Sequence, residues 1–368
     1  MKILHISGAK GWGGNEQQMI YCIPELEKLG CENVVFGVRN SVLEKECLLK
    51  NITFIPTKGS KLKNYKNFSY LRSIVNEFKP NIIHLHTSNS LTFYVLSDLW
   101  YNFKIKCVFS KKAMSASSSF LSKYKYNYSG INSILCVSKT VKDNFSNVLS
   151  KLNKQKAVVI HDCVSTDILN VKSEVNLRER YSIATDKKLI GNIANHTDAK
   201  DLITFIDVVD YLVNSLNKKD VVFFQIGEFT KLTAKFESIV KERKLENYII
   251  FTAKIVNAFS LNSQFDVFLM TSQREGGPTS VLEAMLIGVP VVSTYVGVVP
   301  DVIENGVNGY SSRVKDFSDL ATKIKMLLES ENLEKEFVTR SRDIIQKRFT
   351  ASIIAEETVR HYEKLFSV

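Results

Sequence analysis

Two series of short apolar runs, each separated by amphipathic segments of helical length, organise this chain. In the first half the runs cover residues 1–7, 33–38, 81–86, 106–110, 133–138 and 157–161. In the second half they cover 188–194, 221–227, 248–253, 266–271 and 290–293, with helical segments expected at about 200–213, 232–245, 279–288 and 316–329. Apolar runs that alternate with helices are typical of parallel strands buried on both faces. The pattern therefore predicts two α/β units in tandem.

The apolar periodicity fades between residues 161 and 179, where polar residues dominate, so we expect a linker near 163–175. The predicted domains are 1–165 and 166–345. A helical segment at 346–368 either closes the second domain or crosses back to the first. A length of 368 residues suits two domains of ordinary size.

Composition indicates a globular protein, with 45% hydrophobic and 24% charged residues. No apolar stretch approaches the roughly 20 residues that span a bilayer. The opening run Met1–Ser7 lacks the longer apolar core of a signal peptide, so we expect a cytoplasmic protein. The six cysteines are scattered without a C-x-x-C pair, which predicts buried, reduced thiols rather than a zinc site or a disulfide framework.

The net charge of the chain is concentrated in one segment. Residues 51–150 contain 14 Lys and Arg against 3 Asp and Glu, whereas the other 268 residues carry 35 of each sign. A concentrated basic region favours an anionic partner, such as a phospholipid surface, a phosphate-bearing acceptor or nucleic acid. A solvated basic face without a partner is the alternative.

The segment from residue 271 to residue 294 carries the strongest chemical signal. A predicted strand ends there, a glycine-proline loop follows, and a helix is expected to begin near Thr279. Ligands of open α/β sheets bind at the carboxyl ends of strands, and a helix amino terminus attracts anions such as a diphosphate. Glu275 and Glu283 can place two carboxylates along one side of such a ligand. Ser280 and Glu283 could instead form a capping box, an alternative that does not apply to Glu275.

Residues 275–292 resemble the E-x7-E signature of the retaining glycosyltransferases of family four. These enzymes adopt the GT-B fold, in which two Rossmann-like domains face each other across a cleft. Residues 297–310 resemble the continuation of the signature, with Asp301 at a position that is usually Glu. The resemblance implies that Glu275 contacts donor-sugar hydroxyls and that Glu283 binds the nucleotide ribose. It also implies a sugar and phosphate pocket lined by Gly276, Gly277, Pro278, Thr279 and Ser280.

Residues 191–201 resemble the family segment that places an Arg and a Lys against the donor diphosphate. Lys200 stands at the lysine position, where a fixed ammonium would stabilise the negative charge of the departing diphosphate. Asn195 stands in place of the Arg. Either another basic residue compensates for this lost cation, or the phosphates are held more weakly. A solvent-exposed lysine at a helix start is the alternative interpretation of Lys200.

The first domain offers a glycine loop and a histidine. Gly13 and Gly14 follow the first strand and open a helix, where glycines let backbone amides approach a phosphate closely. The loop lacks the G-x-G-x-x-G pattern and a Walker lysine, which argues against dehydrogenases and P-loop enzymes. Alternation puts His84 and His86 on one strand face. The family has a histidine matching His86 near the reacting sugar carbon, although a purely structural histidine is the alternative.

The resemblance implies a hexosyltransferase that uses a UDP- or GDP-linked sugar as co-substrate and needs no other cofactor. Without a D-x-D motif at a strand end, we expect no required metal. Catalysis is assigned to Glu275, Lys200 and His86. The expected acceptor is a glycan or a lipid-linked glycan, in cell-surface polysaccharide or glycoconjugate synthesis. A nucleotide-sugar epimerase, a glycan phosphorylase or a non-catalytic nucleotide-sugar-binding protein could use the same fold. A nucleic-acid-binding protein is disfavoured because it leaves Glu275 and Glu283 unexplained.

Basic and aromatic side chains interleave over residues 103–130 and include Lys111, Lys112, Lys123 and Lys125. Each lysine near an anionic membrane contributes about 1 kcal/mol of attraction. We therefore expect this segment to contact the acceptor or the membrane. The resulting hypothesis is a peripheral enzyme on the inner face of the membrane.

Overall fold

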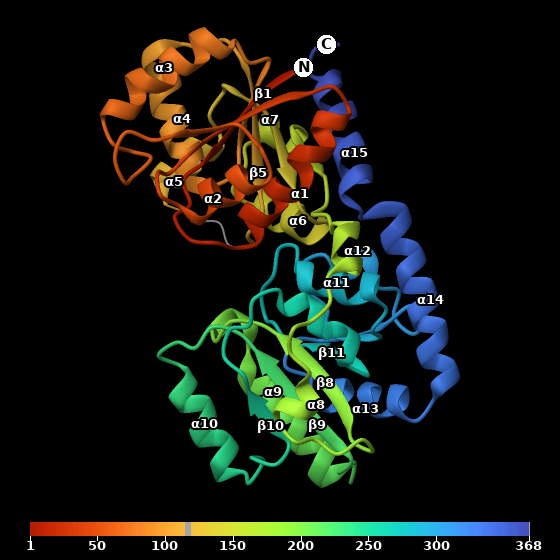
Figure 1. Cartoon of the computed structure of the whole chain (residues 1–368). Coiled ribbons are helices and arrows are strands. Elements are labelled where there is room, and N and C mark those ends of the chain that lie inside the picture. The colour runs from red at the N-terminus through yellow and green to blue at the C-terminus, as the bar shows by residue number, and fades with distance from the viewer. Residues whose placement is uncertain (115–118, 368) are drawn as a thin grey trace. The chain divides into compact units, whose positions relative to one another are not determined.

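The computed structural model describes residues 1–114 and 119–367, and the chain divides into two compact units (Figure 1). The first unit comprises Met1–Cys163 together with Thr350–Val368, and the second comprises Val164–Phe349. Residues 115–118 of the basic segment and Val368 of the predicted range 346–368 lie outside the described residues.

The first unit is a parallel sheet with helices between its strands. The strands are β1 (Lys2–Ser7), β2 (Glu32–Gly37), β3 (Phe54–Pro56), β4 (Ile82–Leu85), β5 (Lys106–Lys111), β6 (Ile131–Cys136) and β7 (Ala157–Val159). Within the described residues they lie in the order β3-β2-β1-β4-β5-β6-β7, and every pair is parallel. The helices are α1 (Gly14–Lys28), α2 (Val42–Leu49), α3 (Lys66–Phe78), α4 (Ser88–Tyr101), α5 (Phe120–Tyr126), α6 (Lys139–Ser146), α7 (Lys151–Gln155) and α15 (Ala351–Lys364).

Helix α15 belongs to the first unit although it comes last in the chain. It packs along α1, as Figure 1 shows. Its buried residues Ile354 and Tyr362 share a hydrophobic cluster with Ile3 of β1 and Leu26 of α1. The apolar spacing of the last helix is therefore satisfied by the amino-terminal sheet.

The second unit repeats the architecture. Its described strands are β8 (Lys188–Ile193), β9 (Val221–Ile226), β10 (Ile249–Phe251), β11 (Val267–Met270), β12 (Val291–Thr294) and β13 (Tyr310–Ser312), in the parallel order β10-β9-β8-β11-β12-β13. The α-helices are α8 (Leu177–Arg180), α9 (Leu202–Asp210), α10 (Thr233–Glu242), α11 (Thr279–Ile287), α12 (Val299–Val302), α13 (Phe317–Leu328) and α14 (Glu331–Arg348). Shorter helical turns are η1 (Thr166–Asn170), η2 (Asp198–Lys200), η3 (Tyr211–Ser215) and η4 (Ala258–Gln264).

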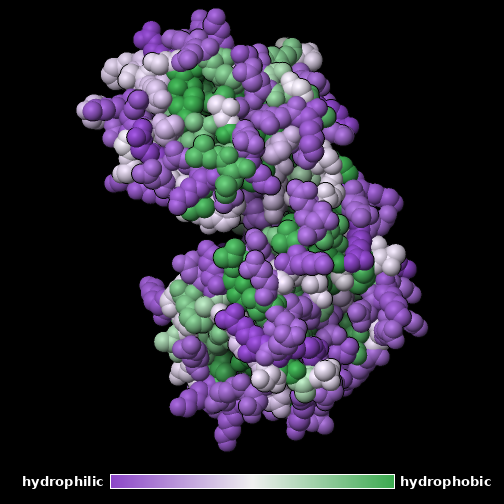
Figure 2. All heavy atoms as spheres, viewed as in Figure 1, coloured by the Kyte–Doolittle hydropathy of each residue, from purple (hydrophilic) through white to green (hydrophobic). Residues whose placement is uncertain are grey.

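The predicted fold class of two parallel-sheet, Rossmann-like units is confirmed. Strands β3 and β13 were not predicted, because β3 ends in a proline and β13 contains two serines, so neither produces a recognisable run of strand-forming apolar residues. In Figure 2, hydrophilic side chains dominate the visible surface of both units and hydrophobic ones gather in smaller areas. Among the described residues, no helix combines the length and apolar character needed to cross a bilayer.

The cysteines are free thiols, as expected, and all but the half-buried Cys22 are buried. The sulfur atoms of Cys22 on α1 and Cys163 at the end of the first unit lie 3.4 Å apart. Burial and the contact with Cys22 raise the pKa of the Cys163 thiol, with the contact contributing more.

Candidate functional site

In the second unit, the loops that follow neighbouring strands β8 and β11 bring Lys200 and Glu275 together. The Lys200 Nζ donates to Glu275 Oε1 over 2.5 Å, although the two residues lie 75 positions apart in sequence. Backbone contacts fix the two loops, since Gln273 N donates to the Ala199 carbonyl over 2.8 Å. Thr271 Oγ1 lies 3.2 Å from the Lys200 carbonyl. The two residues that the sequence assigns to catalysis in this unit thus form one ion pair at the carboxyl end of the sheet.

One oxygen of the Glu275 carboxylate remains available. Glu275 Oε1 accepts hydrogen bonds from Lys200 and from Ser272 Oγ, the latter over 2.8 Å. Across the described residues, no hydrogen bond reaches Glu275 Oε2. The carboxylate is therefore oriented by the protein on one side and can accept hydroxyl groups of a ligand on the other.

Helix α11 begins directly after this loop. Pro278 is its N-cap, and no side-chain hydrogen bond caps the helix. The capping box considered for Ser280 and Glu283 is therefore absent, because Ser280 lies inside the helix rather than at its cap. Glu283 is buried on the same helix. Uncapped amides at the start of a helix favour an anion.

Gly297 and Thr294 support the loop from the neighbouring strand. Gly297 has φ of +61°, and a Cβ there would lie 2.8 Å from the Gly276 carbonyl oxygen, so the backbone approach requires glycine. Thr294 Oγ1 donates to the Ser272 carbonyl over 2.6 Å. The polar residues Ser272 and Thr294 were missed by the sequence analysis, although their positions at strand ends offered a signal. Gly277 and Thr279 complete the segment between Glu275 and the body of α11.

Asn195 holds two loops of the same unit together. Its exposed side chain accepts a hydrogen bond through Oδ1 from the Glu228 backbone amide over 2.9 Å. Its neighbour His196, also missed by the sequence analysis, is fully buried between Thr233 and Gln225. Burial lowers the pKa of His196. Asn195 thus adds no cation, and its oxygen is engaged by the protein itself.

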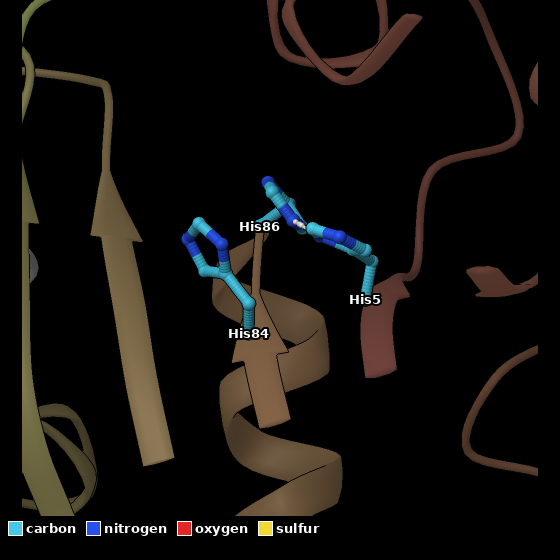
Figure 3. Close-up of side chains that lie close together, drawn as sticks. All are labelled: His5, His84 and His86. Atoms are coloured by element: carbon cyan, nitrogen blue, oxygen red, sulfur yellow. Dashed lines mark hydrogen bonds between the residues drawn. The ribbon is translucent and has the colours of Figure 1, made fainter. Parts of the chain in front are cut away.

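In the first unit, His86 follows β4 and lies in a cluster of three buried imidazoles (Figure 3). His86 Nε2 lies 2.9 Å from Nδ1 of His5 on β1, and the ring centroids of His84 and His86 are 4.0 Å apart. Burial is the main cause that lowers the pKa of each ring, that of His5 to about 4. His84 and His86 share a face as alternation predicts, whereas His5 was not predicted to join them.

These imidazoles form the one group of His, Cys, Asp or Glu in the described chain with ligand atoms close enough to share a metal ion, all within 4.8 Å. Their nitrogens, however, are largely occupied. His5 Nε2 bonds to Asn33 Oδ1 over 3.0 Å, and the His84 ring bonds to both Ser110 and Tyr362 over 2.7 Å. A metal ion would have to displace these hydrogen bonds.

The glycine loop of the first unit opens α1 as expected. Gly13 is the N-cap and Gly14 the first helical residue, with no side-chain cap. A Cβ at Gly14 would meet no protein atom within 4 Å, so the space before this helix is open. Glu16 in the first turn is buried, its Oε1 accepts no hydrogen bond, and burial raises its pKa.

The four lysines assigned to acceptor or membrane contacts lie in different environments. Lys111 is buried on the central strand β5, 5.2 Å above the Phe145 ring, and burial lowers its pKa to about 8. Lys112 pairs with the buried Asp162. Lys123 is exposed on α5, and Lys125 is half-buried there. Only the α5 lysines therefore reach the surface; β5 and its neighbours enclose Lys111, and Lys112 is engaged by a carboxylate.

Two family models match the chain, one in each half. The model of Glycosyltransferase Family 4 matches residues 12–168, and that of Glycosyl transferases group 1 matches residues 174–344. The structure is similar to that of Anabaena HepE in complex with UDP and glucose, with a TM-score of 0.83, 17% identity and full coverage of both chains. This likeness shows the GT-B fold.

Curated relatives point to the same class of enzyme. N-acetyl-alpha-D-glucosaminyl L-malate synthase of Bacillus anthracis is 26% identical over 223 residues, 61% of this chain and 56% of the relative. The O-antigen biosynthesis glycosyltransferase WclY of Escherichia coli is 25% identical over 212 residues, 58% of this chain and 56% of the relative. The chain thus matches just over half the length of these relatives. Fold, family models and relatives together support a glycosyltransferase of the group 1 and family 4 type.

Proposed function

We propose that this protein transfers a sugar, with retention of anomeric configuration, from a nucleotide-sugar donor to a glycan or lipid-linked acceptor. The proposed context is the synthesis of cell-surface polysaccharide or glycoconjugate. The observation that carries the proposal is the Lys200–Glu275 pair at the ends of β8 and β11, directly before the uncapped start of α11. A cation, helix amides and an oriented carboxylate are the groups that a sugar diphosphate needs.

Each group has a distinct proposed task. The Lys200 ammonium and the amides of Thr279 and Ser280 stabilise the charge that develops on the departing diphosphate. Glu275 Oε2 accepts donor-sugar hydroxyls, and Glu283 binds the ribose. With no enzymic nucleophile assigned, the leaving phosphate oxygen helps to deprotonate the acceptor hydroxyl on the same face of the sugar. These roles place the charge stabilisation on the protein, without a required metal.

The comparisons support the donor and the context. HepE, which has the same fold, is known in complex with UDP and glucose, and WclY acts in O-antigen biosynthesis. A nucleotide sugar is therefore the donor class to test first, and a bacterial surface glycan the acceptor class.

A panel of UDP- and GDP-sugars, screened by thermal shift, tests donor binding. A ligand at 100 times its dissociation constant stabilises the protein by about 2.7 kcal/mol. Incubation of the selected donor with glycan acceptors, followed by NMR of the product, then tests transfer and anomeric configuration. A product with inverted anomeric configuration would contradict the proposed retention. Transfer that depends on added divalent metal would contradict the proposed independence of metal. If no nucleotide sugar stabilises the protein, the proposal as a whole is wrong.

The same assays separate the alternatives of the same fold. An epimerase would change the sugar of the nucleotide donor without any acceptor, and a phosphorylase would require free phosphate. A non-catalytic protein would bind the donor without turnover. Transfer that requires both donor and acceptor distinguishes the glycosyltransferase from all three.

We also propose that helix α5 contacts an anionic membrane that carries the acceptor. Phe120 and Leu121 at its start are 81% and 78% exposed, and the exposed Lys123 follows on the same helix. Trp100 on the adjacent α4 is also highly exposed. Exposed aromatic and aliphatic side chains beside lysines suit insertion at a lipid headgroup layer.

Sedimentation with phosphatidylglycerol vesicles tests this contact. The double substitution Phe120→Asp and Leu121→Asp should abolish co-sedimentation. The matched control replaces Leu48 and Leu49 of α2 by Asp, since these leucines are also well exposed. Binding that persists in the α5 variant, or that is lost equally in the α2 variant, would refute the assignment to α5.

A further inference from the structure

Asn33, His5 and His86 form a hydrogen-bonded series with a defined direction, and the third imidazole, His84, packs against His86. Five of the six ring nitrogens of the three imidazoles bond to another described residue, whereas His86 Nδ1 bonds to none. Figure 3 shows this nitrogen pointing away from both His5 and His84. The protonation of His86 Nδ1 therefore depends on which nitrogens of His5 and His86 carry the protons in the hydrogen bonds to Asn33 and to each other.

Asn33 sets the direction at one end. Its Nδ2 donates to the Cys31 backbone carbonyl over 3.1 Å, and a carbonyl oxygen can only accept. The Asn33 Oδ1 must therefore face the His5 ring, and it lies 3.0 Å from His5 Nε2. Because this oxygen accepts, His5 Nε2 carries a proton.

The proton on His5 Nε2 also determines which residue donates in the hydrogen bond between His5 and His86. Burial keeps the His5 ring neutral, so with a proton on Nε2 its Nδ1 is an acceptor. His86 Nε2, 2.9 Å away, must be the donor in that contact. The His86 ring is neutral as well, since burial and the neighbouring His84, His5 and Lys112 all lower its pKa. A neutral ring that is protonated at Nε2 has an unprotonated Nδ1.

His84 holds the His86 ring from the other side. Its two nitrogens bond to Ser110 on β5 and to Tyr362 on α15, each over 2.7 Å, so its ring cannot turn freely. With the two ring centroids 4.0 Å apart, His84 leaves His86 little room to flip. His84 therefore acts in packing, and its nitrogens are not available to a ligand.

We propose that His5 and Asn33 are positioning residues that hold His86 in the tautomer protonated at Nε2, so that its Nδ1 presents a lone pair to a sugar hydroxyl. The assignment of the ligand as a sugar rests on the proposed function, whereas the tautomer does not. His86 then accepts a hydrogen bond and orients a hydroxyl of the donor sugar or the acceptor. As a weak base, it does so without removing the proton.

Nitrogen NMR of the full chain, labelled with 15N only in histidine, tests the tautomer directly. Protonated and unprotonated ring nitrogens of a neutral imidazole have well-separated 15N shifts, and a His86→Gln variant identifies the His86 signals by their loss. At pH 7 we expect an unprotonated Nδ1 and a protonated Nε2. The reverse pattern would overturn the proposal whatever the activity of the protein.

Substitution of Asn33 tests the relay. Asn33→Leu removes the acceptor, so we expect mixed His86 tautomers and a fall in kcat/KM of roughly 5- to 10-fold, the value of one neutral hydrogen bond. Asn33→Gln keeps a neutral amide oxygen as the acceptor toward His5 and should restore part of the 15N pattern and of the rate. Asn153→Leu, a buried amide elsewhere in the unit, is the control for lost stability.

The outcomes separate this inference from the proposed function. If Asn33→Leu shows mixed His86 tautomers but unchanged kinetics, the proposed contact between His86 and the sugar is wrong. Donor binding tests the proposed function independently of this result. One equivalent of tightly bound divalent metal in the purified protein, lost in a His5→Gln variant, would show that the cluster is a metal site and would also overturn the proposal.

Discussion

Replacing Lys200 by Met tests the central assignment because it removes one charge and keeps the length of the side chain. The side chains of Lys200 and Glu275 are 27% and 13% exposed. Their ion pair thus lies between surface pairs, worth about 0.2–1 kcal/mol, and buried pairs, whose disruption costs about 3–5 kcal/mol. We expect the substitution to destabilise the second unit by about 1–2 kcal/mol.

The expected loss of activity is larger than this loss of stability. A unit charge 4 Å from a developing phosphate charge is worth about 4 kcal/mol at an effective dielectric constant of 20. Removing one such electrostatic contact typically lowers kcat by about 10²–10³-fold. Lys200→Met should therefore reduce transfer by that factor while the protein stays folded.

The second unit contains a matched control. Lys200 follows the carboxyl end of β8, and the control residue lies at the amino end of that strand. Lys188, the first residue of β8, pairs with Asp266 over 2.8 Å, with side chains 41% and 21% exposed. Lys188→Met removes a comparable ion pair without touching the proposed donor site. It should lower the thermal midpoint by a similar amount, roughly 2–4 °C per kcal/mol, and leave transfer intact.

Steady-state transfer assays at saturating donor, combined with thermal unfolding of both variants, distinguish a catalytic role of Lys200 from an effect on stability. If Lys200→Met retains transfer within about threefold of the wild type, its proposed role is wrong. If Lys188→Met loses as much activity as Lys200→Met, the effect belongs to lost stability and not to diphosphate charge.

Three further predictions concern the first unit. Gly14→Ala should raise the KM for the donor without lowering stability, because the new Cβ meets no protein atom within 4 Å, whereas Gly37→Ala places its Cβ 2.7 Å from an aromatic ring and should destabilise the fold. Donor titrations and thermal unfolding check both variants. The folded-state pKa of His5, about 4 against 6.5 when unfolded, means that its stabilising contribution is present above pH 6.5 and lost as pH falls toward 4. Relative to a His5→Gln variant, the wild type should lose on the order of 2–3 kcal/mol across this window in urea titrations, and parallel curves would contradict this. Hydrogen peroxide should join Cys22 and Cys163, 3.4 Å apart, in a disulfide with release of two water molecules, and intact-mass measurement should show the loss of two hydrogens, absent in Cys22→Ala.

The sequence predicted best what is encoded in contiguous segments. The described strands of both sheets, except β3 and β13, follow from apolar runs that can be recognised in the sequence. The start of α11 at Thr279 follows from the strand, loop and helix order around Glu275. The sequence assigned Lys200 and Glu275 to one site, because both residues belong to recognisable motifs that follow adjacent strands, but it did not predict the ion pair between them.

Contacts between distant segments were harder to predict. Lys111 was assigned to a surface because it lies among other lysines, yet its strand is central and its side chain buried. A count of charges carries no information about which strand is flanked on both sides. In the same way, Ser280 and Glu283 have the spacing of a capping box, but the N-cap of the helix is Pro278, two residues before Ser280.

The hydrogen-bonding role of His86 could not be predicted from its own sequence motif. His86 is recognisable from its own strand, but its hydrogen-bonding role depends on His5, 81 positions away, and on Asn33, 28 positions from His5. Parallel order places β1 between β2 and β4, so these three residues become neighbours only through the sheet. A histidine conserved in type but lacking these partners could present Nδ1–H instead, and would then donate to a sugar oxygen. The identity of the residue therefore does not determine its role, and the partners on adjacent strands do.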